Sequence, residues 1–248
     1  MKIISISDLP TPSKSLLGFP WTEGSTNFPP QYFEIDLPKI SLVTPSFNQG
    51  QFIEETIRSV ILQNYPNLEY IIIDGGSTDT TVSIIKKYDK WINCWVSEPD
   101  KGQSDAINKG LERVTGDIFN WINSDDLLAP NALWEIAEYF LKNKNIDVLM
   151  GRLQNIELNI LSKVSYRMKY FDNVESTMNF GYMSQPSLFF RLKKIKLLNG
   201  IDIRFNYCMD LDLWYRYLSV YGLSAVTSTE QTLAYYRVHK ATDRKSVV

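Results

Sequence analysis

The sequence predicts an α/β fold in which a mostly parallel, doubly wound sheet is flanked by helices. After residue 39, apolar runs of strand length alternate with amphipathic helical patterns at least four times, and the links between them are short. This alternation is typical of the strand–helix–strand units that build parallel sheets. The predicted strands also end abruptly in polar or acidic residues, and such sheets bind ligands beyond the carboxyl ends of their strands.

The first 38 residues are predicted to form an irregular N-terminal arm, because they contain six prolines, which fix φ and remove backbone donors. Aromatic residues predict that this arm is pinned onto the domain surface instead of forming a flexible leader. They are Phe19, Trp21, Phe28, Tyr32 and Phe33. Residues 39–248 are predicted to form a single domain of two halves, 39–150 and 151–248, with a cleft between them.

The first half is predicted to contain four buried strands, at 40–44, 68–73, 92–96 and from 117 onward. The helices between them show apolar residues at helical spacing, as in Ile53, Ile57, Val60 and Ile61. Ser77 or Thr78 is expected to cap the second helix, since a side-chain oxygen there can bind free N–H groups of the first turn.

The second half has a different pattern. Residues 146–190 read as short, irregular strand-like segments, including one at 187–191. A helix is predicted to begin near Asp210, followed by strands at 223–226 and 232–238.

The stretch from Asp117 to Asp126 is the centre of the predicted site. An apolar strand ends there in Asn123, Ser124, Asp125 and Asp126, and a helix follows Pro130. Adjacent carboxylates repel each other unless a cation lies beside them, and a hard divalent cation prefers oxygen ligands. The alternative is a solvated turn that caps the next helix.

Composition excludes several classes of protein. A net charge of -2 and a pI of about 5.6 argue against a nucleic-acid partner. Cys94 and Cys208 are expected to be reduced thiols, and with a single histidine, His239, a histidine-rich zinc site is excluded. No signal-like or membrane-spanning run is seen, so a cytoplasmic protein is expected, with contact at a membrane surface left open.

Two nucleotide-binding fingerprints, G-x-G-x-x-G and G-x-x-x-x-G-K-[ST], are missing, which argues against a dinucleotide site and a P-loop. Instead, the first strand ends in Thr44, Pro45 and Ser46, and the second ends in Asp74. These tips are expected to lie side by side with the acidic tip of the fourth strand.

The chain resembles bacterial members of glycosyltransferase family 2, which have the GT-A fold. The matching runs are ISLVTPSFNQGQ (40–51), YIIIDGGSTDT (70–80), SEPDKGQSDAINKG (97–110), GDIFNWINSDD (116–126), QPSLFFR (185–191) and MDLDLWYR (209–216). The PWTE run at 20–23 also looks like leaders of one subgroup. The resemblance covers the chain from Lys39 and implies that residues 39–150 bind a nucleotide sugar, while the irregular half, 151–248, faces the acceptor.

The resemblance implies roles for residues at the strand tips. The nucleotide and diphosphate would be bound by Thr44, Pro45, Ser46, Asp74, Lys101 and Asp105. The first two positions of the family's Asp-x-Asp motif would be occupied by Asn123 and Ser124. Asn123 departs from that motif because it carries no charge. Asp125, Asp126 and His239 would then hold a divalent metal, manganese or magnesium; a purely structural His239 is the alternative.

An inverting transfer also needs a base for the acceptor hydroxyl. The candidates are Asp210 and Asp212, with Asp210 preferred because it matches the Asp of the family's Glu-Asp pair, although Met209 replaces the Glu. An N-cap role for Asp210 is compatible with this. Gln185 is expected near the acceptor.

These implications predict an inverting glycosyltransferase that moves a sugar, in the hexosyltransferase class, from a nucleotide-diphospho-sugar to a hydroxyl of a saccharide or lipid-linked acceptor. Cell-surface polysaccharide synthesis in the cytoplasm is the expected setting, with peripheral contact at the inner face of the cell membrane left open. The alternatives are a non-catalytic nucleotide-sugar-binding module and a sugar-phosphate nucleotidyltransferase, although the latter would show a glycine- and arginine-rich loop after its first strand, which Thr44–Gly50 is not.

Overall fold

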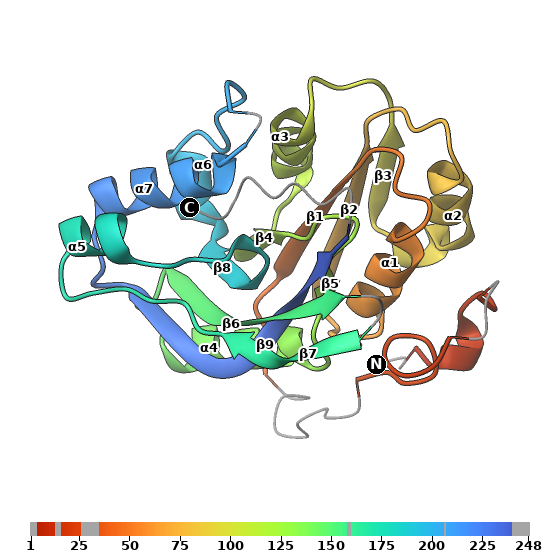
Figure 1. Ribbon diagram of the computed structural model, residues 1–248, viewed down its shortest axis with the longest axis horizontal. Coiled ribbons are helices and arrows are strands. Elements are labelled where there is room, and N and C mark those ends of the chain that lie inside the picture. Colours follow the sequence, from red (N-terminus) through yellow and green to blue (C-terminus); the bar gives the residue numbers. More distant parts are fainter. Residues whose placement is uncertain (1–3, 13–15, 26–34, 158–159, 206, 240–248) are drawn as a thin grey trace.

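A computed structural model describes residues 4–12, 16–25, 35–157, 160–205 and 207–239 (Figure 1). Its centre is a nine-stranded sheet with the order β3-β2-β1-β4-β8-β6-β9-β5, and β7 pairs with β6 off this path. The strands are β1 (Ile40–Ser46), β2 (Leu68–Asp74), β3 (Cys94–Ser97), β4 (Ile118–Trp121), β5 (Leu127–Leu128), β6 (Val148–Glu157), β7 (Ile160–Tyr166), β8 (Leu188–Arg191) and β9 (Val226–Val238). The first four strands are parallel, and the predicted α/β class is confirmed.

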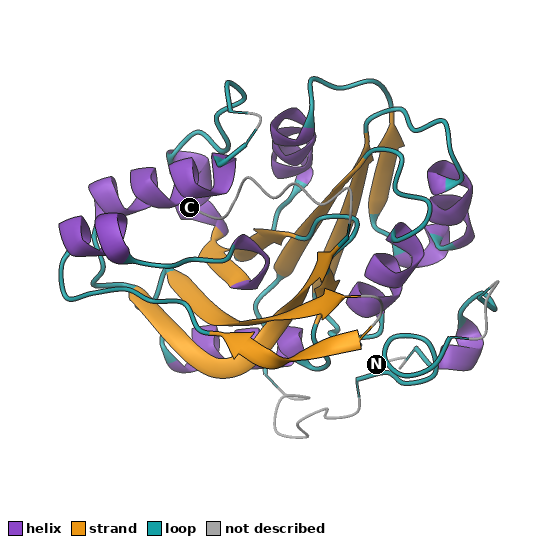
Figure 2. Cartoon of the chain, viewed as in Figure 1, coloured by secondary structure: helices purple, strands orange, loops and turns teal. Residues whose placement is uncertain are grey.

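Helices cover both faces of the sheet (Figure 2). They are α1 (Ile53–Ile61), α2 (Thr81–Lys87), α3 (Gln103–Arg113), α4 (Ala132–Lys142), α5 (Val174–Phe180), α6 (Leu192–Leu197) and α7 (Met209–Tyr221), with 3-10 turns at Ile6–Asp8, Asp89–Trp91 and Gln185–Ser187. Alternation along the strands explains the two layers. Leu42 and Ile72 pack with α1, α2 and α4, whereas Val43 and Ile71 point the other way, toward α3, α6 and α7.

Several predicted boundaries were wrong. The segments at 223–226 and 232–238 are not two strands; β9 is one strand of 13 residues, bulged where it passes Arg152 of β6. Ser77 and Thr78 do not cap α2, which follows Thr80, because the Ser77 hydroxyl bonds Asp74 instead. The helices α5 and α6 were not predicted, because both are short segments in a region without clear periodicity.

The described part of the N-terminal arm packs onto the domain. Trp21 is buried, and Phe19 lies against the core of the α1 face. Phe28, Tyr32 and Phe33 lie outside the described residues. None of the helices in the described ranges has the length and hydrophobicity that a membrane crossing requires.

Candidate functional site

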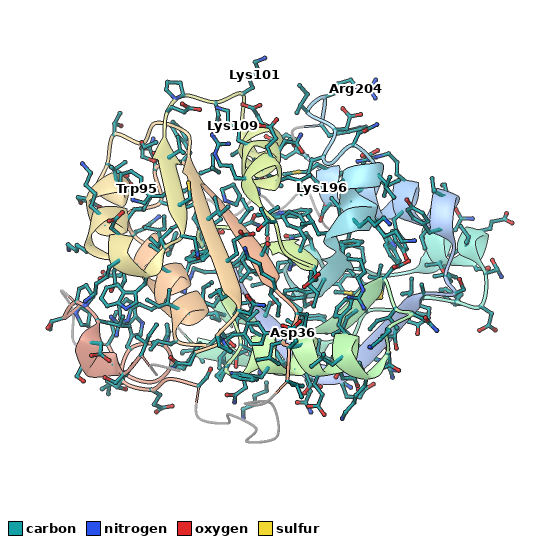
Figure 3. All side chains as sticks on the ribbon, turned by 180° about the vertical axis from the view of Figure 1, so that it is seen from behind. Asp36, Trp95, Lys101, Lys109, Lys196 and Arg204 are labelled. Atoms are coloured by element: carbon teal, nitrogen blue, oxygen red, sulfur yellow. The ribbon has the colours of Figure 1, made fainter. Side chains whose placement is uncertain are left out.

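The carboxyl ends of β2, β1 and β4 lie side by side, as predicted. β1 pairs with β2 through Ser46 and Asp74, and with β4 through Val43 and Trp121. In Figure 3, Lys101 marks this edge of the molecule and points outward, while Asp36 lies at the opposite end. The polar residues that follow three neighbouring strands therefore share one edge.

Asp74, the expected base contact, is fully buried at the tip of β2. Its carboxylate accepts hydrogen bonds from Ser97 Oγ (2.7 Å), the Ser77 amide (2.9 Å) and the Gly76 amide (3.2 Å). These bonds fix the Gly75–Gly76 turn. The Asp100 carboxylate lies only 2.7 Å from where a Cβ on Gly75 would be, so a side chain there would displace it.

The tip of β1 offers an unused polar group. Thr44 Oγ1 is paired with Tyr70 Oη at 3.1 Å, and Pro45 lies opposite Ile73 of β2. By contrast, Ser46 Oγ is buried, at 5% exposure of the residue, and has no hydrogen-bond partner among the described residues. A buried hydroxyl without a partner is costly, which favours a ligand that bonds it.

Lys101 and Asp105 lie at the start of α3. The Asp105 carboxylate accepts from the Lys101 amide at 3.0 Å and lies 3.6 Å from Lys109 Nζ. These contacts fix the loop before the helix, and the Lys101 side chain is exposed.

The segment that follows β4, residues 123–126, is called the acidic turn here, and it contains one buried carboxylate. Asp126 is 1% exposed and accepts from the Arg237 amide (3.0 Å) and Asn123 Nδ2 (3.2 Å). Burial, and then the neighbouring Asp125, raise its pKa well above the ordinary range. Both carboxylate oxygens of Asp126 thus accept hydrogen bonds from the protein, and a direct contact of Asp126 with a metal stays a prediction. Ser124 is also buried.

Asn123 is part of the same buried group. Its Oδ1 accepts from Gln103 Nε2 at 2.6 Å, while its amide donates to Asp126. The residue that lacks the family's charge thus supplies a donor that an aspartate could not supply.

Asp125 lies beside His239. Asp125 Oδ2 and His239 Nε2 are 3.0 Å apart, and the His239 ring packs on Phe52 with centroids 4.5 Å apart. This separation is that of a hydrogen bond between the two side chains. Adjacent ligands of an octahedral cation, each about 2.1 Å from it, also lie about 3 Å apart, so the two atoms could instead share a divalent ion. Among the described residues no three His, Cys, Asp or Glu side chains form a metal cluster. Such an ion would need oxygens from its substrate, as is usual for magnesium sites.

Arg237 is the main residue that the sequence did not reveal. It lies on β9, which pairs with β5 directly after the acidic turn. Its Nε donates to the Asp125 carbonyl at 3.0 Å, and its Nη2 pairs with Glu55 Oε2 at 2.7 Å. Only the pairing of strands more than 100 residues apart brings it to the turn, so no local pattern could have found it.

Asp210 and Asp212 begin α7. The loop before this helix is tied to α3, where Ser104 Oγ donates to the Phe205 carbonyl at 2.8 Å. Asp210 is half-buried, and desolvation raises the pKa of its carboxyl. Asp212 instead pairs with Arg216 Nε at 2.8 Å.

Gln185, expected near the acceptor, is buried against β4. Its Nε2 donates to Asn120 Oδ1 (2.8 Å) and to the Trp121 carbonyl (2.7 Å). This places it as a support for the strand end, and a direct sugar contact stays a prediction. A surface cavity of about 420 Å³ is lined by Asp36, Asn67 and Asp117, at the amino ends of the parallel strands, and takes no part in this arrangement.

Comparison with known proteins agrees with this architecture. Residues 41–209 match the model of the family described as glycosyl transferase family 2. An uncharacterized glycosyltransferase of Rickettsia typhi is 30% identical over 82% of this chain and 65% of its own length. TuaG of Bacillus subtilis, named as a teichuronic acid biosynthesis glycosyltransferase, is 36% identical over 42% of this chain and 43% of its own. The chain thus spans about 65% of the length of the Rickettsia relative.

Two solved structures share the fold and confirm the predicted GT-A class. S. aureus TarS 1-349 in complex with UDP-GlcNAc has a TM-score of 0.69 at 18% identity, covering 85% of this chain and 61% of that chain. The mannosyltransferase PcManGT from Pyrobaculum calidifontis, in complex with GDP-Man and Mn2+, has a TM-score of 0.61 at 16% identity, covering 84% and 59%.

Proposed function

The chain belongs to glycosyltransferase family 2, and on that premise we propose that it transfers a sugar from a nucleotide-diphospho-sugar to an acceptor hydroxyl, with inversion at the anomeric carbon. The observation that carries this proposal is the Asp125–His239 pair, at the carboxyl edge of the sheet where the donor is expected. TarS bound to UDP-GlcNAc and PcManGT bound to GDP-Man share the fold and support a nucleotide-sugar donor of this kind.

The donor is proposed to lie across the tips of β1, β2 and β4. Ser46 Oγ has no hydrogen-bond partner among the described residues and would bond the nucleoside. Asp74 would act mainly by holding the glycine turn, although a direct base contact remains part of the proposal. Lys101, exposed at the start of α3, would approach the diphosphate together with Asp105.

Asp125 and His239 are proposed to hold a divalent cation, manganese or magnesium. When bound, such an ion would supply positive charge next to the departing diphosphate. Asp126 would act differently: it anchors the turn through the Arg237 amide and Asn123, and so fixes the direction of Asp125.

Asp210 is proposed as the base. It would accept the proton of the acceptor hydroxyl while that oxygen forms a bond to the anomeric carbon and the bond from this carbon to the diphosphate breaks. The raised pKa of Asp210 suits a base that works near neutral pH. The Asp212 carboxylate is already engaged in an ion pair with Arg216, which leaves it less available to an acceptor hydroxyl, so Asp210 stays our preferred candidate.

The acceptor is proposed to be a saccharide or a lipid-linked saccharide in cell-surface polysaccharide synthesis, as the name of the TuaG relative suggests. Attachment to the inner face of a membrane belongs to the same proposal. The lysine run within α6 gives it little support, because Lys194 pairs with Asp147 at 3.0 Å and Lys196 donates to the Val114 carbonyl.

The proposal is tested by donor binding and turnover. Ligand-detected NMR with UDP-, GDP- and dTDP-sugars, each with and without manganese, is expected to show metal-dependent binding of one nucleotide class. Asp125→Ala should abolish the metal dependence, whereas Glu230→Gln, at an exposed residue of β9 that pairs with Arg152 of β6, should not.

Turnover separates the alternatives. Slow, metal-stimulated hydrolysis of the bound donor is expected from a transferase, and a chelator should stop it. Binding without any turnover, even with a range of acceptors, would favour the non-catalytic binding module. Formation of a nucleotide sugar from a sugar phosphate would favour the nucleotidyltransferase.

A further inference from the structure

We propose that α1 is a positioning element of the proposed metal site and that Thr56 is its main positioning residue. The helix would fix the separation between Asp125 and His239, because a different side chain of α1 holds each side of this pair. This inference rests on the proposed function, since it concerns the two residues that are expected to share a divalent ion.

Buried polar side chains line the side of α1 that meets the acidic turn and β5. Thr56 and Ser59 lie within the helix, Gln63 follows its last turn, and all three are fully buried. A polar side chain that is removed from water needs hydrogen-bond partners. Each of these three finds one or more of its partners in the backbone of residues 126–133, a segment that begins in the acidic turn and includes β5.

The hydrogen bonds between these side chains and that segment follow the same order along both. They are Thr56 Oγ1 donating to the Asp126 carbonyl (2.8 Å), Ser59 Oγ accepting from the Leu128 amide (3.2 Å), Gln63 Nε2 donating to the Ala129 carbonyl (2.9 Å) and Gln63 Oε1 accepting from the Leu133 amide (3.3 Å). The chain that leaves the acidic turn is therefore held at several successive points by one helix.

Hydrogen bonds of this kind set the position of the segment along the helix. An apolar side chain in the place of Thr56 would fill a similar volume but would allow the segment to slide, whereas a hydrogen bond weakens steeply when its geometry departs from the optimum. β5 consists of only Leu127 and Leu128, so its pairing with β9 gives limited restraint. The bonds from α1 supply the restraint that so short a strand lacks.

One turn before Thr56, α1 also contacts the other member of the pair. Phe52 is the N-cap residue of the helix, and its ring packs on the His239 ring with centroids 4.5 Å apart. The Thr56 amide donates to the Phe52 carbonyl at 3.3 Å, and residues four apart lie on one side of a helix. α1 thus contacts His239 through Phe52, and it contacts the residue next to Asp125 through Thr56.

Asp126 connects Thr56 to the geometry of Asp125. The Asp126 amide donates to the Asn123 carbonyl at 3.0 Å, and its carboxylate accepts from Asn123 Nδ2 at 3.2 Å. Asp126 is therefore bonded through its amide, its side chain and, by Thr56, its carbonyl. Without the bond to the carbonyl, the turn would rotate more freely, and Asp125 Oδ2 would leave its position 3.0 Å from His239 Nε2.

The test compares variants of buried hydroxyl residues in the full chain. Thr56→Val keeps the branched shape and removes the hydroxyl, whereas Thr56→Ser keeps the hydroxyl. Ser59→Ala is a milder variant, because it removes the bond to Leu128, which is farther from the pair. Thr177→Val is the matched control: Thr177 is 3% exposed, and its hydroxyl also donates to a backbone carbonyl, that of Asn173 at 2.9 Å, but on α5.

His239 is the only histidine in the sequence, so its imidazole proton resonances report on the site directly, provided that no histidine tag is attached. Thr56→Val is expected to shift these resonances in the metal-free protein. It should also raise the concentration of added manganese that half-broadens them by about three- to tenfold, less than the 10- to 100-fold typical of groups that bond metal ligands directly. Thr56→Ser should behave nearly like the wild type, Ser59→Ala should show smaller shifts than Thr56→Val, and Thr177→Val should show none.

Wild-type resonances and manganese titrations for both Thr56→Val and Ser59→Ala would overturn the positioning role, and if Thr56→Val does not fold, Ser59→Ala decides. Equal effects of Thr56→Val and Thr177→Val would also overturn it, because they would indicate a general loss of stability. If Asp125→Ala abolished the broadening by manganese in these cases, the proposed function would stand without the role of α1. If Asp125→Ala were broadened like the wild type, the proposed metal site would fail, and its positioning by α1 with it.

Discussion

Asp210 and Asp212 show how two carboxylates of one short motif acquire different chemistry from their surroundings. Asp212 has a cation at 2.8 Å, and Arg216 also binds the carbonyls of Leu198 and Gly200, which closes the α6–α7 loop. Within the described part of the chain, the Asp210 carboxylate accepts only from backbone amides at its own helix N-terminus, including that of Leu211. The sequence could place both at the start of a helix, but the identity of their partners depends on the fold.

Asp210→Asn is expected to lower kcat by about 10²- to 10⁴-fold while leaving donor binding unchanged, because it removes the proposed base. Burial raises the pKa of Asp210, and the base must be ionised, so wild-type kcat should rise with pH through that raised pKa. A pH–kcat profile with a saccharide acceptor checks this. Asp212→Asn should instead lower stability by less than about 1 kcal/mol with kcat nearly intact, because it weakens a partly exposed ion pair. The reverse pattern would reassign the base.

Asn123 gives a second prediction at this scale. Asn123→Asp is expected to lower the free energy of unfolding by about 1 to 3 kcal/mol at neutral pH, because it replaces a donor to buried Asp126 with another acceptor. Chemical denaturation of the metal-free protein measures this. Asn123→Ala is the matched control and should cost less, since it removes the donor without adding a charge. An Asn123→Asp protein as stable as the wild type would contradict the assignment.

At the scale of elements, the sequence predicted the structures that depend on local patterns, but not those that depend on contacts between residues far apart in the chain. The strands and helices of the first half could be predicted because their apolar residues repeat at periods of 2 and 3.6, which burial imposes locally. β9 could not be predicted as one strand, because polar residues between Ser228 and Gln231 interrupt its pattern, and its continuity comes from pairing with β6. The contact of Arg237 with the acidic turn could therefore not be predicted from the sequence.

β1, β2 and the loop before β4 are joined at their amino ends by Glu69. Its carboxylate accepts from Thr115 N (2.7 Å) and lies 2.7 Å from Lys39 Nζ, while Ser41 Oγ also donates to it. Burial alone would raise the pKa of Glu69, but the hydrogen bonds from Lys39, Ser41 and Thr115 lower it to about 2.

A carboxyl with a lowered pKa stabilises the fold above its unfolded pKa of about 4.3, and this contribution is lost as pH falls toward 2. Glu69→Gln should therefore cost about 1 to 3 kcal/mol at pH 7, with the difference from the wild type shrinking in acid. Denaturation at a series of pH values measures it. Because this edge is opposite the proposed donor site, nucleotide affinity should not change. A stability difference between Glu69→Gln and the wild type that grows in acid would contradict the stabilising role of Glu69.

At the scale of the whole molecule, the N-terminal arm buries a second side of α1. The sequence predicted an apolar face of Ile53, Ile57, Val60 and Ile61, and these residues are buried. Arg58 is buried as well, because the arm covers the opposite side of the helix. Periodicity marks the face toward the sheet, but it cannot show that a proline-rich segment covers the other face.

Arg58→Met is expected to release the arm, because it removes three contacts to arm carbonyls and one to Tyr88 Oη. The free energy of unfolding should fall by about 2 to 3 kcal/mol. Limited proteolysis followed by mass spectrometry should show faster cleavage within residues 4–25. Arg152→Met, at a partly exposed ion pair with Glu230, is the control and should change stability by less than about 1 kcal/mol. Equal cleavage rates in both variants would contradict the conclusion that Arg58 holds the arm on the domain.

The position of β9 within the sheet also has a consequence for protein synthesis. This strand lies between β6 and β5, yet it is translated after every other strand of the sheet. A nascent chain can form the β1–β4 layer while it is still attached to the ribosome, but its acidic turn must wait for Arg237 and His239. The capacity to bind a donor is therefore expected to arise only after β9 has been synthesised, which protects the growing chain from engaging substrate before this sheet is complete.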